Sequence, residues 1–178
     1  RREDLNRIED GGAIGGADPA DVSDAAKKRG FDQCGTMGSG NHFMEVQLVE
    51  TIFETGLAGQ WGIAEGTIAV MIHSGSRGLG YQVSDEFWKR SKKALSQFGI
   101  SVPDAQLSPL PVRDALGREY LSAMRCAANF AFANRQALMH QVRKVFTEFF
   151  SGSAESLGLK LVYDVAHNIA KEEEYTVD

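Results

Sequence analysis

The sequence predicts an α+β fold, in which a mixed sheet packs against helices within one domain over residues 1–178. Two observations predict this class. Strand-like and helix-like patterns both occur, and they follow one another without the regular strand–helix alternation of a parallel α/β sheet. The composition, 43% hydrophobic and 24% charged, is that of a globular chain long enough to bury one core.

The first predicted elements are a short helix and two strands. The helix runs from Pro19 to the residue before Gly30, because Asp18 is a favourable N-cap, proline suits the first helical position and glycine commonly ends a helix. Residues 43–49 alternate between apolar and polar side chains, which is typical of a strand. Residues 67–72 form a continuous apolar run, which predicts a fully buried strand.

The second half of the chain is expected to hold longer helices. Residues 81–98 have a helical pattern that ends at Gly99, and the proline-rich residues 103–111 predict a loop. The longest helix is expected from about residue 114 to 150. Residues 160–165 are apolar enough to form another buried strand.

One charged residue interrupts the apolar stripe of the longest helix. The stripe advances in steps of three and four, through Leu121, Met124, Ala128, Ala131, Leu138, Val142, Val145 and Phe149. The same steps place Arg135 on it, where a charge is costly unless it is paired or faces a site. We therefore expect Arg135 to be buried, either paired with a carboxylate or directed at a site.

Charge and cysteine content exclude several classes of protein. A net charge of −5 argues against a broad nucleic-acid-binding surface, although it permits a small basic phosphate pocket. No apolar run approaches the roughly 20 residues that cross a bilayer, and no signal peptide is visible, so no membrane partner is expected. Cys34 and Cys126 lack a zinc-type spacing and are expected to be small buried thiols in a cytoplasmic protein. The chain begins with Arg1 rather than methionine, which indicates a piece of a longer protein; the sequence indicates no oligomeric state.

Three of the four histidines share one setting. His42, His73 and His167 each lie where a predicted strand meets a loop that carries glycine or asparagine. A single histidine is usually structural, but three in this setting predict one converging metal or phosphate site. The fourth, His140, lies off the apolar stripe of its helix and is expected to be a solvated surface residue.

The loop that leads to His42 has the composition of an anion-binding turn. Gly38 and Gly40 would let backbone N–H groups approach a phosphate beside Asn41, although the same residues also suit a tight turn before a strand. Phe43 and Glu45 share one face of the strand that follows. An aromatic ring and a carboxylate on one face suit a purine, by stacking and by accepting N–H hydrogen bonds; an ordinary half-exposed strand is the alternative.

The other two histidine segments also carry polar groups. After His73 come two serines, Arg77 and three glycines, so metal, phosphate and backbone amides could meet there; the glycine spacing does not match the dinucleotide-binding pattern. Asp164 and His167 could be a metal ligand and the side chain that orients it, or a plain strand exit. Neither a serine nucleophile elbow nor a P-loop is present in the sequence.

These segments resemble the RtcB family, the GTP- and manganese-dependent RNA-splicing ligases. The matching stretches are residues 35–45, 70–83, 127–136 and 163–168. The resemblance implies an RtcB-type ligase fold, of which residues 1–178 are the central part of the catalytic domain. It also implies an enzyme that joins a 2′,3′-cyclic-phosphate or 3′-phosphate RNA end, such as a tRNA half, to a 5′-hydroxyl end. GTP guanylylates a histidine, GMP passes to the RNA 3′-phosphate, and the 5′-hydroxyl displaces GMP.

The resemblance also assigns site residues. It implies that three ligands of a two-manganese site are His42, His73 and His167. It implies a GTP pocket in which Asn41 contacts the phosphate. The part of the pocket that holds the guanine nucleotide is lined by Phe43, Glu45 and Asn168. It further implies phosphate-binding or catalytic roles for Arg77 and Arg135.

Two family features are missing from this sequence. The upstream Asp-x-x-Cys segment, whose cysteine bridges both metals, is absent, since Asp32-Gln33-Cys34 has a different spacing. The downstream histidine that takes the guanylyl group is absent too. We therefore expect the isolated chain to lack ligase activity. The alternatives are a manganese- or zinc-dependent phosphoesterase that uses the same histidines on water, and a non-catalytic module that binds nucleotides or RNA ends.

Overall fold

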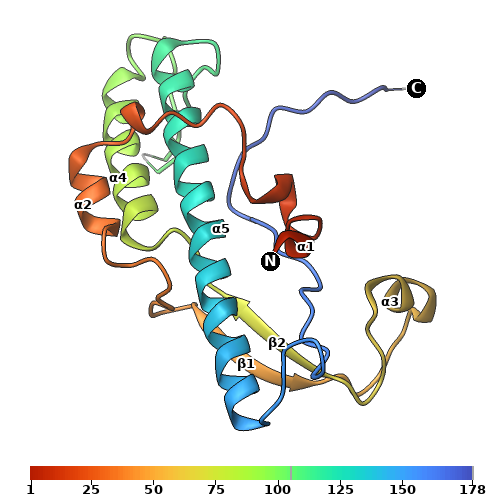
Figure 1. Cartoon of the computed structure of the whole chain (residues 1–178). Coiled ribbons are helices and arrows are strands. Elements are labelled where there is room, and N and C mark those ends of the chain that lie inside the picture. The colour runs from red at the N-terminus through yellow and green to blue at the C-terminus, as the bar shows by residue number, and fades with distance from the viewer. Residues whose placement is uncertain (105, 178) are drawn as a thin grey trace.

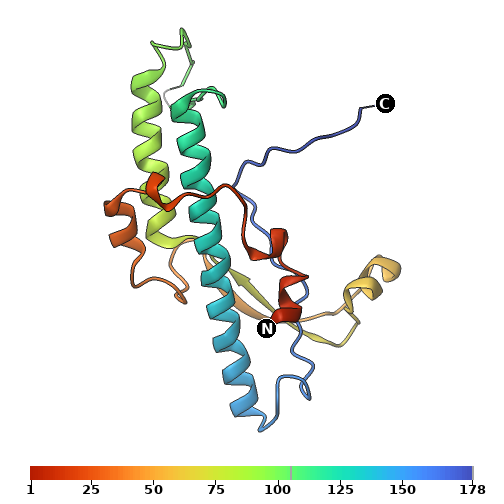
Figure 2. The same ribbon diagram turned by 45° about the horizontal axis from the view of Figure 1, so that its top comes forward.

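The computed structural model describes residues 1–104 and 106–177. One long helix, α5 (Ala115–Phe149), runs the height of the molecule in Figure 1. Helix α4 (Arg77–Ala94) packs against its first half, helix α2 (Asp24–Gly30) packs against α4, and the strands lie beside the second half of α5. A 45° rotation in Figure 2 shows the C-terminal segment extending away from this body. The mixture of helices with a small sheet confirms the α+β class.

Helix α5 confirms the predicted bounds almost to the residue. Asp114 is its N-cap, and the Asp114 Oδ1 atom accepts a hydrogen bond from the Leu116 backbone N–H at 2.9 Å. Ala123, which lies beside the predicted stripe, contributes to a core shared with α2 and α4, which is formed by Val22, Ala26, Val83, Phe87 and Ala123. Cys126, predicted to be buried, is half-buried and packs against this core.

The first predicted helix is broken into two. A short 3₁₀ helix, η2 (Pro19–Asp21), is capped by Asp18, whereas α2 is capped separately by Ser23, whose Oγ accepts from the Ala26 N–H at 3.1 Å. The break occurs because Val22, between them, is extended and buried in the core, at 5% exposure. Tertiary packing of one apolar side chain thus overrides the continuous helical pattern.

Helix α4 starts four residues before the predicted helix and ends four residues before its predicted end. Two of the three glycines after His73, Gly78 and Gly80, lie within its first turn, so residues 77–80 are helical. Gly30, the last residue of α2, allows close contact here, because a Cβ atom at that position would lie 2.7 Å from the Leu79 Cβ atom. Gly30 was predicted to end the helix, but it is the last helical residue. Its lack of a side chain instead lets α2 pack closely against α4.

The sheet has two antiparallel strands, β1 (Phe43–Leu48) and β2 (Ile68–His73), which pair with Phe43 opposite His73. A short helix, α3 (Thr55–Trp61), lies in the connection between them. Both strands were predicted, but the prediction that β2 is fully buried is wrong: Ile68 is 58% exposed. Burial of both faces requires neighbouring layers, and the described residues form only this strand pair.

The predicted buried strand at residues 160–165 is also wrong. This segment makes one parallel bridge, in which the Asp164 N–H donates to the Arg7 carbonyl at 2.9 Å and the Glu9 N–H donates to the Asp164 carbonyl at 2.9 Å. Asp164 is buried, but its neighbours Tyr163 and Val165 are 54% and 51% exposed. A single bridge does not extend into a ladder, so the segment passes the N-terminal region as an irregular chain.

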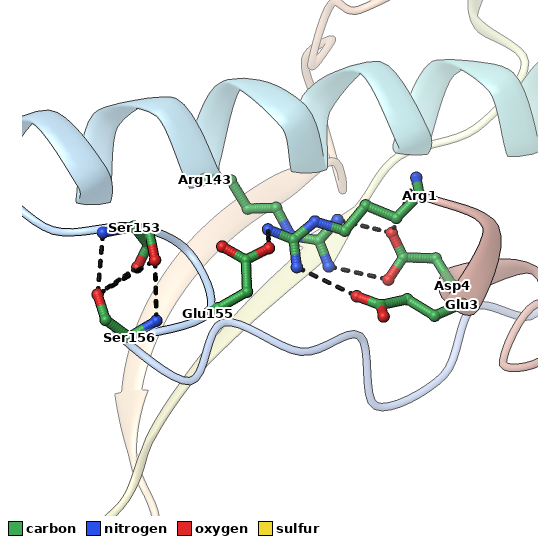
Figure 3. A network of polar contacts seen from close by, with 7 residues as sticks. All are labelled: Arg1, Glu3, Asp4, Arg143, Ser153, Glu155 and Ser156. Atoms are coloured by element: carbon green, nitrogen blue, oxygen red, sulfur yellow. Dashed lines mark hydrogen bonds and ion pairs between the residues drawn. The ribbon is translucent and has the colours of Figure 1, made fainter.

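The N-terminal helix α1 (Arg2–Leu5) is tied to α5 by the polar network of Figure 3, and the 3₁₀ helix η1 (Glu9–Gly12) follows it in the chain. The Arg143 guanidinium donates to both carboxylate oxygens of Asp4, at 2.6 and 2.9 Å, and Asp4 is only 2% exposed. The hydrogen bonds and charge of Arg143 outweigh burial and lower the pKa of Asp4. Among the described residues, no helix has the length and apolar character needed to cross a membrane.

Candidate metal and nucleotide site

The structure brings together the three histidines that were predicted to lie at strand ends. His73, the last residue of β2, lies between the other two: its ring centroid is 6.3 Å from that of His42 and 5.1 Å from that of His167. His42 directly precedes β1, so the pairing of Phe43 with His73 places these two histidines side by side. His167 arrives from the irregular C-terminal segment. The three imidazole rings therefore lie near one another.

A hydrogen bond orients His42. Its Nδ1 atom lies 3.0 Å from the Met37 carbonyl oxygen. A carbonyl oxygen can only accept, so in the neutral imidazole Nδ1 carries the proton and Nε2 keeps the lone pair. Histidines that bind metals are held in this way, with one ring nitrogen donating to a carbonyl and the other facing the ion. The same Met37 carbonyl also accepts from the Ser74 Oγ atom at 2.7 Å, which links the loop before β1 to the loop after β2.

The three imidazoles do not form a completed metal site. Over residues 1–104 and 106–177, no group of three or more histidine, cysteine, aspartate or glutamate side chains is already arranged to hold an ion. Three neutral imidazoles also bring no negative charge to balance a divalent cation. Imidazole nitrogens are common metal ligands, so the three histidines could supply part, but not all, of a ligand set.

The segment of His167 is fixed by two neighbouring residues. Asp164 pairs with Arg135, and the Ala166 N–H donates to the Glu9 Oε2 atom at 2.8 Å. The carboxylate that we considered as the orienting partner of His167 therefore has a different contact. Burial raises the pKa of Asp164, against the opposing effect of the Arg135 charge.

Arg135 lies where its helical phase predicts. Its side chain is 11% exposed, and its Nε atom donates to the Asp164 Oδ1 atom at 2.6 Å. Its Nη1 atom donates to the Ser74 carbonyl at 3.1 Å, and the guanidinium lies over the Phe132 ring. The prediction of a buried arginine paired with a carboxylate is confirmed.

Arg77 reaches the His42 side of the cluster. Its Nε atom donates to the Thr36 Oγ1 atom at 3.0 Å, and its backbone has a φ of 54°, which is rare for a residue with a side chain. Gly38 shows how tightly these groups are packed. A Cβ atom at this position, where φ is 100°, would overlap both the Arg77 Nη1 atom and the His42 Nδ1 atom. The glycine loop thus wraps around an arginine and a histidine at once.

Of the four predicted nucleotide residues, three are exposed and Phe43 contacts the cluster. Phe43 is half-buried, with its ring 5.0 Å from the His73 ring, and Glu45 shares its strand face. The exposed Glu45 carboxylate accepts from the Gln47 Nε2 atom at 2.8 Å. The remaining predicted nucleotide residues, Asn41 and Asn168, are both exposed.

A hollow in the protein surface lies elsewhere. It has a volume of about 400 Å³, lies against α5 and is lined by Arg1, Gln136, Met139, His140, Arg143, Lys144 and Thr147. None of the histidines of the cluster lines it, and Arg143 there is occupied by Asp4. His140 is exposed, as predicted, whereas Cys34, predicted to be buried, is exposed. Its neighbours Gly35 and Thr36 turn toward α5 and leave the Cys34 thiol in solvent.

One residue of the site region was missed by the sequence analysis. Asn134 is fully buried in the middle of α5, at 0% exposure. It lies four and seven residues from the buried Leu138 and Ala127, so it occupies the buried face. Asparagine is unfavourable inside a helix unless its amide is satisfied, and this was the available signal.

A small sheet that gathers three histidines, an arginine and a glycine loop at one end defines a candidate metal- and phosphate-binding protein. The family model described as tRNA-splicing ligase RtcB matches residues 1–178, and the chain belongs to this family. The chain is 50% identical over 176 residues to the tRNA-splicing ligase RtcB of Pyrococcus abyssi, covering 99% of this chain and 19% of the relative. It is 49% identical over 175 residues to that of Thermococcus kodakarensis, covering 98% and 36%. It is 49% identical over 177 residues to that of Pyrobaculum aerophilum, covering 99% and 36%. The chain thus spans only about a fifth to a third of the curated relatives it matches.

Proposed function

We propose that the intact protein carrying this chain is an RNA ligase. It would join RNA ends that bear a 2′,3′-cyclic phosphate or 3′-phosphate to ends that bear a 5′-hydroxyl, by GTP- and manganese-dependent guanylyl transfer. Relatives named tRNA-splicing ligases support tRNA halves as one substrate. The observation that carries the proposal is the meeting of His42, His73 and His167 at one end of the sheet in a chain of this family.

The metal would be held by these three histidines. The free Nε2 lone pair of His42 supports this role, because the Met37 carbonyl fixes the other ring nitrogen as a donor. Bound manganese would neutralise phosphate oxygens and lower the pKa of an attacking group. Arg77, held by Thr36 beside His42, would place its guanidinium on a phosphate oxygen.

The nucleotide would lie over the strand face that ends at His73. Phe43 would stack on the guanine base, and the Glu45 carboxylate would exchange its Gln47 contact for two N–H groups of the guanine edge. Asn41 and Asn168, both exposed beside neighbouring histidines, would contact the nucleotide from the two flanking loops.

The isolated chain is expected to be inactive as a ligase. The chain offers three imidazoles but no anionic ligand beside them, and its sequence lacks the histidine that takes the guanylyl group in the family. The decisive experiment incubates the intact protein with radiolabelled GTP and manganese and looks for a covalent GMP adduct, followed by ligation of 3′-phosphate to 5′-hydroxyl RNA. Phosphate release without an adduct would instead identify a metal-dependent phosphoesterase. RNA-end or nucleotide binding without either reaction would identify a binding module.

A further inference from the structure

We infer that Asn134 and Arg135, consecutive residues on α5, are the positioning residues that hold the three histidine segments in one arrangement. Neither residue is a member of the histidine cluster. Each instead bonds to the backbone or side chains that flank a histidine. The positioning role follows from contacts in the structure. Its consequence for metal and nucleotide binding rests on the proposed function.

Asn134 joins the first two segments. Its Oδ1 atom accepts from the N–H groups of Gly35 and Thr36, at 2.7 and 3.1 Å, in the loop that leads to His42. Its Nδ2 atom donates to the Thr36 carbonyl at 3.2 Å. The same Nδ2 atom lies 3.2 Å from the Ser74 Oγ atom and 3.0 Å from the Gly75 carbonyl, directly after His73. One buried amide therefore bonds to both loops.

Arg135 joins the second and third segments. Its Nη1 atom donates to the Ser74 carbonyl at 3.1 Å, one residue after His73. Its Nε atom donates to the Asp164 carboxylate at 2.6 Å, three residues before His167. The fork of the guanidinium reaches both at once, which the single ammonium of a lysine cannot reproduce.

Sheet pairing alone does not fix this arrangement. It sets β1 beside β2, but His42 and Ser74 lie just beyond the paired strands, and His167 lies on a segment without a strand. The amide of Asn134 is fully buried, so its removal leaves the N–H and carbonyl groups of two loops without their partner. We therefore expect the loops to shift before α5 itself is lost.

The same helix provides matched controls. Asn129 also bonds a segment distant in the chain, since its half-buried amide exchanges two hydrogen bonds with the backbone of Ile14, at 2.7 and 3.1 Å. Arg143 also forms an ion pair with an almost fully buried carboxylate, Asp4. Each control therefore has the same side chain, on the same helix, with the same type of contact, but it holds the N-terminal region instead of a histidine segment.

The first readout is the protonation pattern of the imidazole nitrogens, followed by NMR in metal-free intact protein. In the unaltered protein, His42 should show a protonated Nδ1 and an unprotonated Nε2, because Met37 accepts from Nδ1. Asn134→Ala should give mixed tautomers at His42, because the loop that carries Met37 loses its anchor. Asn129→Ala should leave the His42 pattern unchanged. A purely structural loss of stability would not separate the two variants in this way.

The second readout is Mn²⁺ affinity, measured from the free-ion electron paramagnetic resonance signal. Asn134→Ala and Arg135→Lys should each weaken Mn²⁺ binding by about 10–100-fold, the range seen when residues behind metal ligands are changed. Asn129→Ala and Arg143→Lys should stay within about twofold. If Asn134→Ala does not fold, as judged by circular dichroism, Arg135→Lys decides the question with Arg143→Lys as its control.

The two ideas can fail separately. Folded Asn134→Ala and Arg135→Lys proteins with unchanged imidazole patterns and unchanged Mn²⁺ affinity would overturn the positioning inference. Absence of Mn²⁺ binding in the unaltered protein would overturn the metal part of the proposed function instead. In that case the imidazole comparison in metal-free protein still decides whether Asn134 positions His42.

Discussion

Phe43 and His73 are direct partners across the two strands, and their rings meet edge to face with centroids 5.0 Å apart. This contact couples the proposed nucleotide face to the proposed metal ligands. The side chain expected to stack on guanine rests on one expected to bind manganese. Changes on this strand face should therefore separate into effects on nucleotide choice and effects on the metal.

Glu45 should determine the preference for GTP. Its carboxylate shares a strand face with Phe43 and can accept two N–H bonds from a guanine edge, which adenine does not offer in the same pattern. In the intact protein, Glu45→Ala should reduce the GMP adduct and erode selectivity for GTP over ATP, by about 1.5–3 kcal/mol. Gln47→Ala, which removes the present partner of Glu45, is the matched control and should retain selectivity. Labelled GTP and ATP would be compared on gels, and full adduct yield with full selectivity in Glu45→Ala would misplace the pocket.

His73→Ala should behave differently from Glu45→Ala. His73 contacts both of the other rings of the cluster, at centroid distances of 6.3 Å from His42 and 5.1 Å from His167. Its loss should abolish adduct formation with either nucleotide, because a metal ligand is removed whichever base is offered. The exposed His140, which lies on α5, supplies a control in which His140→Ala should keep the adduct. Residual GTP-dependent labelling in His73→Ala would argue against a shared metal site.

The isolated chain should bind manganese weakly. Three neutral imidazoles leave a divalent ion under-neutralised, and the described residues provide no completed ligand set. Calorimetric titration of the 178-residue chain should give micromolar or weaker affinity, reduced further by His73→Ala and unchanged by His140→Ala. Tight binding that survives His73→Ala would place the metal ligands elsewhere.

The elements that the sequence predicted well are those whose causes are local. Helix α5 follows from a cap at Asp114 and from an apolar stripe with helical spacing, and both are visible in a short window. The phase of that stripe also placed Arg135 correctly. The proximity of His42 and His73 was predictable because strand pairing brings residues at the ends of neighbouring strands together, whereas His167 arrives from a segment without the predicted strand.

The elements that were predicted wrongly depend on distant contacts. Burial of Ile68 or Val165 depends on which layers lie beside them, and an apolar run does not specify those layers. The break at Val22 depends on a core that α4 and α5 complete. Asn134 was missed because its partners lie about 60 and 100 positions away in the chain, in two loops that have no pattern of their own.

The ion pair between Asp4 and Arg143 should make the free energy of unfolding depend on pH in the acid range. Arg143 lowers the pKa of Asp4 below its usual 3.8, so the pair's contribution is complete above that value and is lost as pH falls through the lowered pKa. Asp4→Asn should destabilise the chain near neutral pH by about 3 kcal/mol, at the lower end of values for broken buried pairs. It should also flatten the acid limb of the urea-unfolding free energy. Asp24→Asn, at a fully exposed side chain, should change neither the stability near neutral pH nor its acid dependence. An unchanged acid dependence in Asp4→Asn would show that this ion pair does not cause it.

Gly38 should tolerate no side chain, and Gly40 provides the comparison. Both have positive φ, of 100° and 76°, so alanine strains the backbone at each by about 1–2 kcal/mol. Only at position 38 would the new Cβ atom also overlap the Arg77 guanidinium and the His42 ring, whereas at position 40 no atom outside the adjoining residues lies within 4 Å. Gly38→Ala should therefore displace Arg77 and His42. His42 should no longer hold a single tautomer with the proton on Nδ1, and Mn²⁺ binding should weaken at least about tenfold. Gly40→Ala should lower stability similarly through backbone strain but retain the tautomer. Equal effects of both changes on His42 would show that backbone strain, rather than the packing of arginine and histidine around Gly38, dominates this loop.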